Sequence, residues 1–330
     1  MNTQAAVQEM QKLYKTVASP RTASRAKRWL GVVLRMLFIV GFCFLILYPV
    51  ILMLSRAFMS KADIFDNEVI LLPKSFTLDT VKLAAKMLHY GESLLNSLII
   101  SSSSALLQTA SCILAGYGFA RFNFRFKGLL FAMVIFTMIV PPQLVIIPVF
   151  MQFYDFNPLG LVHLFGQNLS LIDSYTPFLL LSATASALKN GLFIFLFRQF
   201  FKNMPKETEE SALVDGAGTF RTFASIMVPN AVTIIATVFL FAFVWQYNDI
   251  VFSSTFLPNM RTLPLGYVLL NTIPQEDVIR NGLDPLLSSP QYMAAIKSTG
   301  VLLILAPILI LYIFTQRYFV EGIERSGLVG

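Results

Sequence analysis

Long apolar runs separated by shorter polar segments dominate this chain. Six of the runs have about the length that a helix needs to cross a lipid bilayer, roughly 20 residues. They lie at 36–54, 93–119, 129–153, 175–197, 226–248 and 293–314. A membrane-spanning segment must satisfy its own backbone hydrogen bonds, which favours helices. The pattern therefore predicts an all-α integral membrane protein with six transmembrane helices.

Two of the expected helices carry interruptions. Pro141, Pro142 and Pro148 lie within the third run, where proline removes a backbone donor and bends a helix. A bend of this kind is buried or lines a cavity, because freed carbonyl groups need partners. The third helix is therefore expected either to line a pathway or to carry a purely structural kink. Lys189 interrupts the fourth run.

Composition supports the membrane assignment and excludes a soluble globular protein, and the length of the runs excludes an outer-membrane β-barrel. Hydrophobic residues make up 56% of the 330 residues and charged residues only 13%, against about 25% charged in ordinary soluble domains. A soluble core could not hide so much apolar surface. The runs are also far longer than the roughly 10-residue alternating strands of an outer-membrane barrel.

The positive charges are distributed unequally between the two sides of the expected bundle. Fifteen of the 25 lysines and arginines fall in the N-terminal segment, the second and fourth connections and the C-terminal segment, and seven in the other connections. Lysine and arginine favour the cytoplasmic side. Both termini and the polar segment 203–224 are therefore expected in the cytoplasm. The net charge of +7 is explained by positive residues distributed around the expected spans. We therefore expect contact with membrane lipid and not with nucleic acid.

The chain contains none of the common motifs of catalysis or metal binding. It has no GxxxxGK[S/T] phosphate loop, no HExxH and no CxxC. Cys43 and Cys112 lie inside apolar runs and are expected to be core residues. Carboxylate relays of the kind that proton-driven transporters use are not evident in the runs. We therefore expect no enzyme activity, no metal site and no cofactor bound by this chain.

The polar segment 203–224 predicts two short helices joined by a turn. Pro205 suits a first helical turn, and the acidic residues that follow it, Glu209 and Glu210 among them, suit the positive end of a helix. Gly216 permits a sharp turn. Thr219 is placed to cap a second helix that runs from Phe220 towards the fifth apolar run.

The spacing of this segment resembles the cytoplasmic coupling loop, or EAA loop, of bacterial ATP-binding-cassette importer permeases. The resemblance implies that the loop docks onto a separate ATPase, which would hold the ATP and Mg. The residues expected to make this coupling are Glu209, Glu210, Ser211, Ala212, Leu213, Asp215, Gly216, Thr219, Phe220 and Phe223. Serine at 211 replaces the more usual alanine of the motif.

Further motifs extend the resemblance over nearly the whole chain from about residue 30. They are Gly-Tyr-Gly-Phe-Ala-Arg-Phe at 116–122, Pro-Pro-Gln at 141–143, Phe-Leu-Phe-Arg-Gln-Phe-Phe at 195–201, Tyr-Asn-Asp at 247–249 and Gln-Arg-Tyr-Phe-Val-Glu-Gly at 316–322. Together they resemble the permease subunits of maltose-type carbohydrate importers. The resemblance implies a type I ABC importer permease fold: a cytoplasmic segment 1–28, a six-helix domain 29–316 and a cytoplasmic tail 317–330. Gln316, Arg317 and Gly322 of that tail would contact the ATPases.

The function implied by this resemblance is ATP-driven import of a sugar, expected to be an oligosaccharide, by alternating access across a bacterial plasma membrane. The implied partners are a second homologous permease, an ATPase dimer and an extracytoplasmic solute-binding protein. Two alternatives stay open on the residues alone. The chain could serve an importer of a non-sugar solute, or it could be a secondary transporter that acts without an ATPase.

Lys189 is the most unusual charge in the expected spans. It precedes Arg198 by nine residues, which is about 13 Å along a helix. A lysine at such depth is costly and usually faces a cavity or a polar partner. We expect it to line a substrate pathway together with Asn190, Gln246 and Asn248. The alternative is a structural break at which Lys189 pairs with protein groups.

Overall fold

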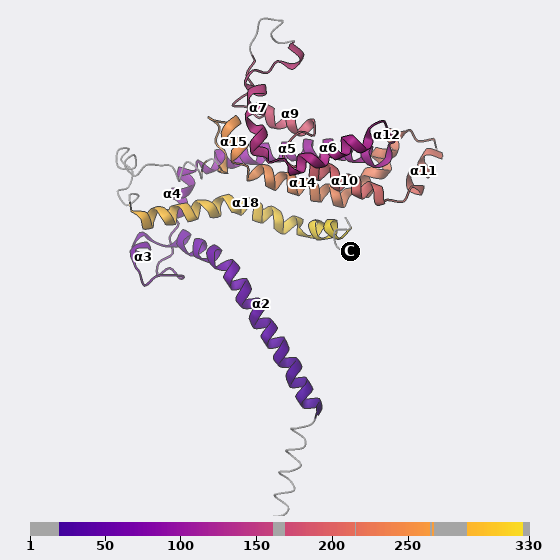
Figure 1. Ribbon diagram of the computed structural model, residues 1–330. Helices are drawn as coiled ribbons and strands as arrows, with labels where there is room; N and C mark the ends of the chain where they lie inside the picture. Colours follow the sequence, from indigo (N-terminus) through magenta and orange to yellow (C-terminus); the bar gives the residue numbers. More distant parts are fainter. Residues whose placement is uncertain (1–19, 161–168, 215, 265, 267–288, 326–330) are drawn as a thin grey trace, which may run out of the picture. The chain divides into compact units, whose positions relative to one another are not determined.

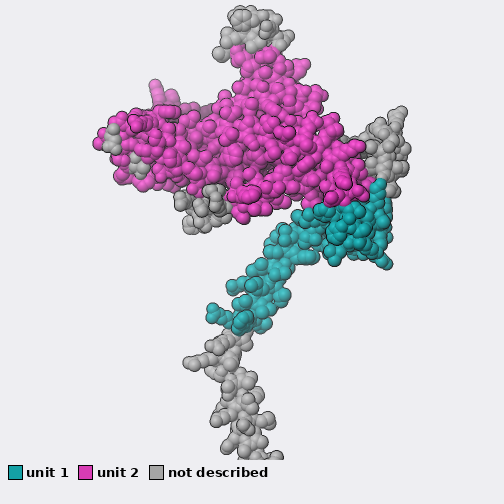
Figure 2. Space-filling view, turned by 180° about the vertical axis from the view of Figure 1, so that it is seen from behind, with its two compact units in different colours: residues 1–77 teal, residues 78–330 magenta. Residues whose placement is uncertain are grey.

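A computed structural model describes residues 20–160, 169–214, 216–264, 266 and 289–325. The side chains of 20–27, 159, 208, 213 and 317–325 lie outside this description. Among the described residues the secondary structure is helical apart from one isolated β-bridge, between Met59 and Phe76. The prediction of an all-α protein is therefore confirmed. The chain divides into two units, 1–77 and 78–330, which Figure 2 distinguishes by colour.

The first unit consists mainly of one long apolar helix, α2 (Pro20–Phe58), followed by the short α3 (Lys61–Phe65). Residues 28–58 of α2 meet the length and composition of a membrane span, and their side chains are largely exposed. In the connection that follows, Asp63 accepts hydrogen bonds from the backbone N–H and the hydroxyl of Ser75, at 3.0 and 3.2 Å. The bond from the Ser75 amide is the main cause that lowers the pKa of Asp63.

The second unit is organised around α5 (Tyr90–Arg121), as Figure 1 shows. This helix packs against α9 (Thr176–Ala183), α10 (Asn190–Asn203) and α14 (Val232–Tyr247). A further long helix, α18 (Pro290–Arg325), packs against α14 and against α4 (Asp79–Met87). The contact between α5 and α10 is close at Gly116, where an added Cβ would lie 2.4 Å from the Cβ of Phe197. Only glycine fits at this crossing.

Two expected spans are bent pairs of helices. α6 (Lys127–Ile139) and α7 (Pro142–Tyr154) meet at 104°, at the break that Pro141 and Pro142 impose. α12 (Thr219–Thr222), the π-helical turn η2 (Phe223–Met227) and α13 (Val228–Asn230) lead into α14 at 78°. The described residues therefore contain three single helices long enough to span a membrane, or up to five spans if each bent pair is one.

The fourth expected span, 175–197, is not one helix in the structure, which corrects that prediction. It is α9 and α10 separated by residues 184–189, in which Ala185 and Lys189 have positive φ angles of 53° and 65°. Left-handed residues cannot continue an α-helix. The break thus falls at the lysine that interrupts the apolar run, and the count of six spans stays a prediction.

Two apolar clusters are formed by the described residues of the second unit. The larger cluster joins α5, α10 and α14 through buried side chains such as Phe193, Phe197 and Val238. The smaller cluster centres on Phe256 of α15 (Val251–Phe256), whose ring lies 5.9–6.0 Å from the rings of Phe153 and Phe178. The smaller cluster therefore packs α15 against residues of α7 and α9.

Candidate functional site: a polar helical loop and a groove

The polar segment between α10 and α14 folds as the sequence predicts, into a helical loop. α11 (Glu207–Val214) and α12 are joined by a turn in which Gly216 has a φ of 80°. The two helices lie together at one end of the second unit, and α18 runs towards the same end (Figure 1). A positive φ favours glycine, so the motif glycine is required here by the backbone.

Glu209 of α11 is held by the end of α5. Its Oε1 accepts a hydrogen bond of 2.8 Å from the hydroxyl of Tyr117. Its Oε2 lies 3.3 Å from Nε of Arg121, a close ion pair without hydrogen-bond geometry. Arg121 also donates from Nη2 to the carbonyl of Met204, at 2.9 Å. The Arg121 and Glu209 side chains are only 7% and 15% exposed, so this pair is shielded from solvent.

The other predicted coupling residues divide between an inward and an outward face. Ala212 and Phe223 are buried, and the Phe223 ring packs 4.8 Å from that of Tyr117. Glu210, Ser211, Gly216, Thr219 and Phe220 are exposed. Among the described side chains, the large apolar members of the outward face are Val214 and Phe220, which are 86% and 77% exposed. Exposed apolar side chains are characteristic of interaction surfaces where they gather into a contiguous patch.

One prediction for this loop is wrong, and two others fall on residues or side chains outside the description. Thr219 does not cap the second helix, which corrects that prediction: the cap position is Gly218, and no side chain caps there. The helix starts one residue earlier than expected. Asp215 and the side chain of Leu213 lie outside the described residues.

The C-terminal segment continues α18 without a break at residue 316. The helix runs to Arg325, so Arg317 and Gly322 are helical, although their side chains are outside the description. Gln316 is exposed, and its Nε2 donates to the carbonyl of Ile313 at 3.3 Å. The contacts expected of this segment with an ATPase stay a prediction.

A groove of about 1020 Å³ lies between the bent pair α6–α7 and the broken pair α9–α10. Most of its lining is apolar, from residues such as Phe119, Met133 and Phe178. Polar groups are contributed by Gln152, Thr184, Lys189, Asn190 and Gln246, among others. Three of the four residues predicted for the pathway are thus brought together, and Asn248 is not among the lining residues. Asn248 instead donates to the carbonyl of Val244 at 2.9 Å, at the end of α14.

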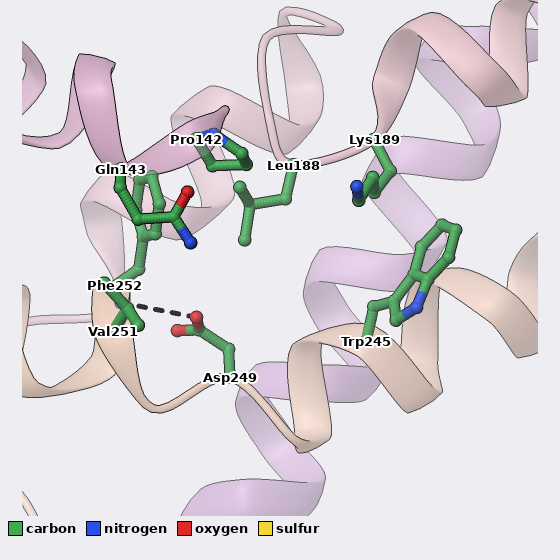
Figure 3. Close-up of a pocket in the computed structure, with 8 residues that line it drawn as sticks. All are labelled: Pro142, Gln143, Leu188, Lys189, Trp245, Asp249, Val251 and Phe252. Atoms are coloured by element: carbon green, nitrogen blue, oxygen red, sulfur yellow. Dashed lines mark hydrogen bonds between the residues drawn. The ribbon is translucent and has the colours of Figure 1, made fainter. Parts of the chain in front are cut away.

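Lys189 lies at the start of α10 and points towards a small pocket of about 150 Å³ (Figure 3). Its Nζ is 5.8 Å from the centre of the Trp245 ring, a cation–π contact. Asp249 lines the same pocket, but its carboxylate accepts from the backbone N–H groups of Phe252 and Ser253, at 3.3 and 2.8 Å. Lys189 forms no ion pair with any carboxylate among the described residues.

Two amide side chains beside the groove are incompletely bonded. Asn190 is buried, and its Oδ1 accepts a short hydrogen bond from Nε2 of Gln108, which also donates to the carbonyl of Leu188 at 2.6 Å. The Nδ2 of Asn190 and the Nε2 of Gln246 have no hydrogen-bond partner among the described residues. A buried donor without a partner is unfavourable, so these two amides are the least favourably placed polar groups beside the groove.

Sequence reasoning did not identify four residues that complete these two regions. Tyr117 and Arg121 belong to the motif at 116–122, but no contact with the loop was predicted for either residue. Trp245 and Asp249 flank residues that were chosen for their amides. Their roles depend on which helices pack together, and the spacing of residues along one helix does not show this. No group of three histidine, cysteine, aspartate or glutamate residues comes together in the described part of the chain as a metal site would require.

Comparison with known proteins gives a family match and several similar transport permeases. A family model described as "Binding-protein-dependent transport system inner membrane component" matches residues 112–325. The maltodextrin transport system permease protein MdxG of Bacillus subtilis is 28% identical over 309 residues, covering 92% of this chain and 98% of that protein. The sn-glycerol-3-phosphate transport system permease protein UgpE of Yersinia pestis is 25% identical, covering 91% and 98%.

A solved structure has the same fold. It is a crystal structure of a bacterial ABC transporter involved in the import of the acidic polysaccharide alginate. Its matching chain superimposes with a TM-score of 0.69 at 21% identity, over 89% of this chain and 98% of that chain. The family match covers about two thirds of the residues. The chain therefore belongs to the inner membrane components of binding-protein-dependent transport systems, multi-pass membrane subunits of transport and not enzymes.

Proposed function

We propose that this chain is the permease subunit of an ATP-driven importer that moves a sugar, expected to be an oligosaccharide, into a bacterial cell. The partners would be a second homologous permease, an ATPase dimer that holds ATP and Mg, and an external solute-binding protein. Both termini and the loop of α11 and α12 would lie in the cytoplasm. Support for a sugar comes from the maltodextrin permease among the relatives.

The observation that carries this proposal is the outward face of the helical loop. Val214 and Phe220 expose large apolar side chains beside the exposed polar residues Glu210, Ser211 and Thr219. A membrane subunit that drives transport with energy from another protein needs such a surface outside the bilayer. We propose that this face binds the ATPase, with Glu210 and Ser211 at its centre and the end of α18 nearby. ATP-driven closure of the ATPase dimer would then move the loop and reverse the opening of the groove.

The groove is the proposed pathway for the solute. Apolar and aromatic walls suit the ring faces of a sugar, and Lys189, Asn190 and Gln246 supply groups that can bond its hydroxyls. A lysine in a membrane protein that forms no ion pair among the described residues needs a polar surrounding, which a water-filled pathway provides. Asn248 would lie at the end of the pathway, where its amide donates to the backbone of α14.

Docking of the loop is tested with Gly216→Trp. A Cβ at this position would meet no atom within 4 Å, so the indole would project from the loop and block a partner without disturbing the core. We expect the variant to insert normally, to lose co-purification with the co-expressed ATPase, and to lose uptake. Gly216→Ala is the matched control, because it carries the same backbone strain without the bulk. Wild-type co-purification and uptake by the tryptophan variant would refute the docking face.

The position of Lys189 is tested by cysteine labelling. In a background that lacks Cys43 and Cys112, we expect Lys189→Cys to react with a charged, membrane-impermeant thiol reagent, and the rate to change with ATP. Leu240→Cys, a buried position on α14, is the matched control and should not react. Absence of labelling in every state, together with full uptake by Lys189→Met, would make Lys189 a structural residue.

A second solute class has its own support. One relative is a permease for sn-glycerol-3-phosphate, a phosphate ester and not a saccharide. Binding of candidate solutes to the neighbouring external binding protein distinguishes the two classes. A secondary transporter is distinguished by uptake into vesicles that contain this chain without any ATPase.

A further inference from the structure

We infer that Tyr117 and Arg121 are positioning residues for energy coupling, which bind Glu209 so that α11 and α5 move as one body. The inference rests on the proposed function and assigns different roles to Glu209 and Glu210, the two neighbouring glutamates of the loop. Glu210 belongs to the face that binds the ATPase. Glu209 is the internal attachment of that face to the helix at the centre of the second unit.

The first support is that the Glu209 carboxylate is already engaged within this chain. One oxygen accepts from Tyr117 at 2.8 Å and the other is paired with Arg121 at 3.3 Å. Glu210 is exposed, although it precedes the same small residues of the motif. A partner that used Glu209 would first have to break a shielded ion pair, which is unfavourable when it leaves a buried charge without its partner.

The second support is the packing around this attachment. The Tyr117 ring lies 5.4 Å from the ring of Phe201 on α10 and 4.8 Å from that of Phe223 in η2. Arg121 also binds the carbonyl of Met204, where α10 ends. One helix end therefore contacts both segments that enter and leave the loop. A displacement of α11 cannot be absorbed by the connections alone and must be passed to α5.

The third support is where α5 leads. Gln108 lies nine residues before Tyr117 on the same helix, about 13 Å away at 1.5 Å per residue. Its amide binds the carbonyl of Leu188 and the side chain of Asn190, on either side of the left-handed Lys189. A rigid helix thus joins the loop to the break in the groove wall. Contiguous packed and hydrogen-bonded elements of this kind can carry coupling between two sites.

The experiment uses the whole transporter, co-expressed with its ATPase and partner permease and purified as a complex. A single cysteine at Gln143, an exposed residue that lines the small pocket beside Lys189, reports on the break in the groove wall in a background without Cys43 and Cys112. The quantity measured is the ratio of its labelling rates by a charged thiol reagent with and without ATP. Recovery of the ATPase in the complex is measured on the same samples.

We expect Glu209→Gln and Arg121→Met to retain the ATPase but to reduce the ATP-dependent labelling ratio at least ~5-fold, the low end of measured coupling factors. Tyr117→Phe, which removes only the hydroxyl, should reduce the ratio less. The charge swap, Glu209→Arg with Arg121→Glu, should recover part of it. Arg125→Met is the control, since that arginine is exposed at the same end of α5 and has no contact with Glu209 among the described residues.

Two results would overturn the inference. Wild-type ratios in both Glu209→Gln and Arg121→Met would show that the pair does not transmit. Loss of the ATPase from the Glu209→Gln complex would show that Glu209 is a docking residue. Failure of the proposed function appears differently, as a wild-type chain that recovers no ATPase or shows no effect of ATP.

Discussion

The loop end of α5, at Tyr117 and Arg121, and its groove end, at Gln108, differ in how the buried polar groups around them are held. At the loop end, both oxygens of Glu209 have partners and the surrounding rings of Tyr117 and Phe223 are in contact, while the Nε of Arg121 is held by the ion pair without a hydrogen bond. At the groove end, Asn190 and Gln246 each keep an amide nitrogen without a partner among the described residues. The groove end also contains a non-glycine residue, Lys189, in a left-handed conformation.

This difference matches what each end has to do in a transporter. A transmitting element must be rigid, and a carboxylate with both oxygens engaged inside a packed aromatic cluster is held in one position. A wall that opens and closes must have a second arrangement of similar free energy. Strained backbone and unpaired donors lower the stability of the observed arrangement and so bring an alternative within reach. The comparison therefore predicts that substitutions at the two ends act in different ways.

The largest effect is expected from a residue on which both ends depend. Gly116→Leu would place a side chain against Phe197 and the backbone of Arg198, where a Cβ alone would lie 2.4 and 3.0 Å away. α5 and α10 would have to separate, which should lower the free energy of unfolding by about 3 kcal/mol. Thermal unfolding in detergent measures this loss. Gly118→Leu is the matched control, because a Cβ there meets its nearest atom at 4.0 Å; equal destabilisation of the two variants would contradict the packing argument.

Gln108→Leu should have the next largest effect, at the groove end alone. The substitution leaves the carbonyl of Leu188 and the amide oxygen of Asn190 without their donor. Loss of a buried hydrogen-bond partner costs about 1–3 kcal/mol. We expect lower thermal stability with normal co-purification of the ATPase, because Glu209 is not disturbed. A variant that loses the ATPase as well would show that the two ends are not separable.

Lys189→Gly should act on stability and on function in opposite directions. Glycine relieves a left-handed conformation that costs other residues about 1 kcal/mol or more, so the variant should unfold at a higher temperature. Uptake should fall, because the ammonium group over Trp245 is lost. Ala185→Gly provides the control, since it relieves the same kind of strain at a φ of 53° without removing a charge. If Lys189→Gly retained full uptake, the ammonium group would have no part in transport.

The parts of the molecule that were predictable from the sequence are those governed by local rules. Apolar run length indicated the helices, Pro141 and Pro142 indicated a bend, and Gly216 indicated the turn of the loop. The left-handed break at Lys189 was harder to predict from the sequence. Ala185 and Lys189 have no intrinsic preference for positive φ, and tertiary contacts impose it. Tyr117 and Arg121 could not be assigned for a related reason. Their partner Glu209 is 92 residues after Tyr117 along the chain, and no periodicity connects them.

The smallest effect on stability, and the sharpest test of the comparison, is expected from Gln246→Leu. The Nε2 of Gln246 has no hydrogen-bond partner among the described residues, so an apolar side chain of similar size removes an unsatisfied donor and not a bond. Such a replacement can be neutral or slightly stabilising, and we expect a change within about 0.5 kcal/mol. Uptake should nevertheless show a raised KM, because the amide lines the groove through which the solute passes. Thermal unfolding and initial uptake rates on the same preparations separate the two effects. A clear loss of stability would mean that the amide is bonded in the working protein, and that the groove end is as well satisfied as the loop end.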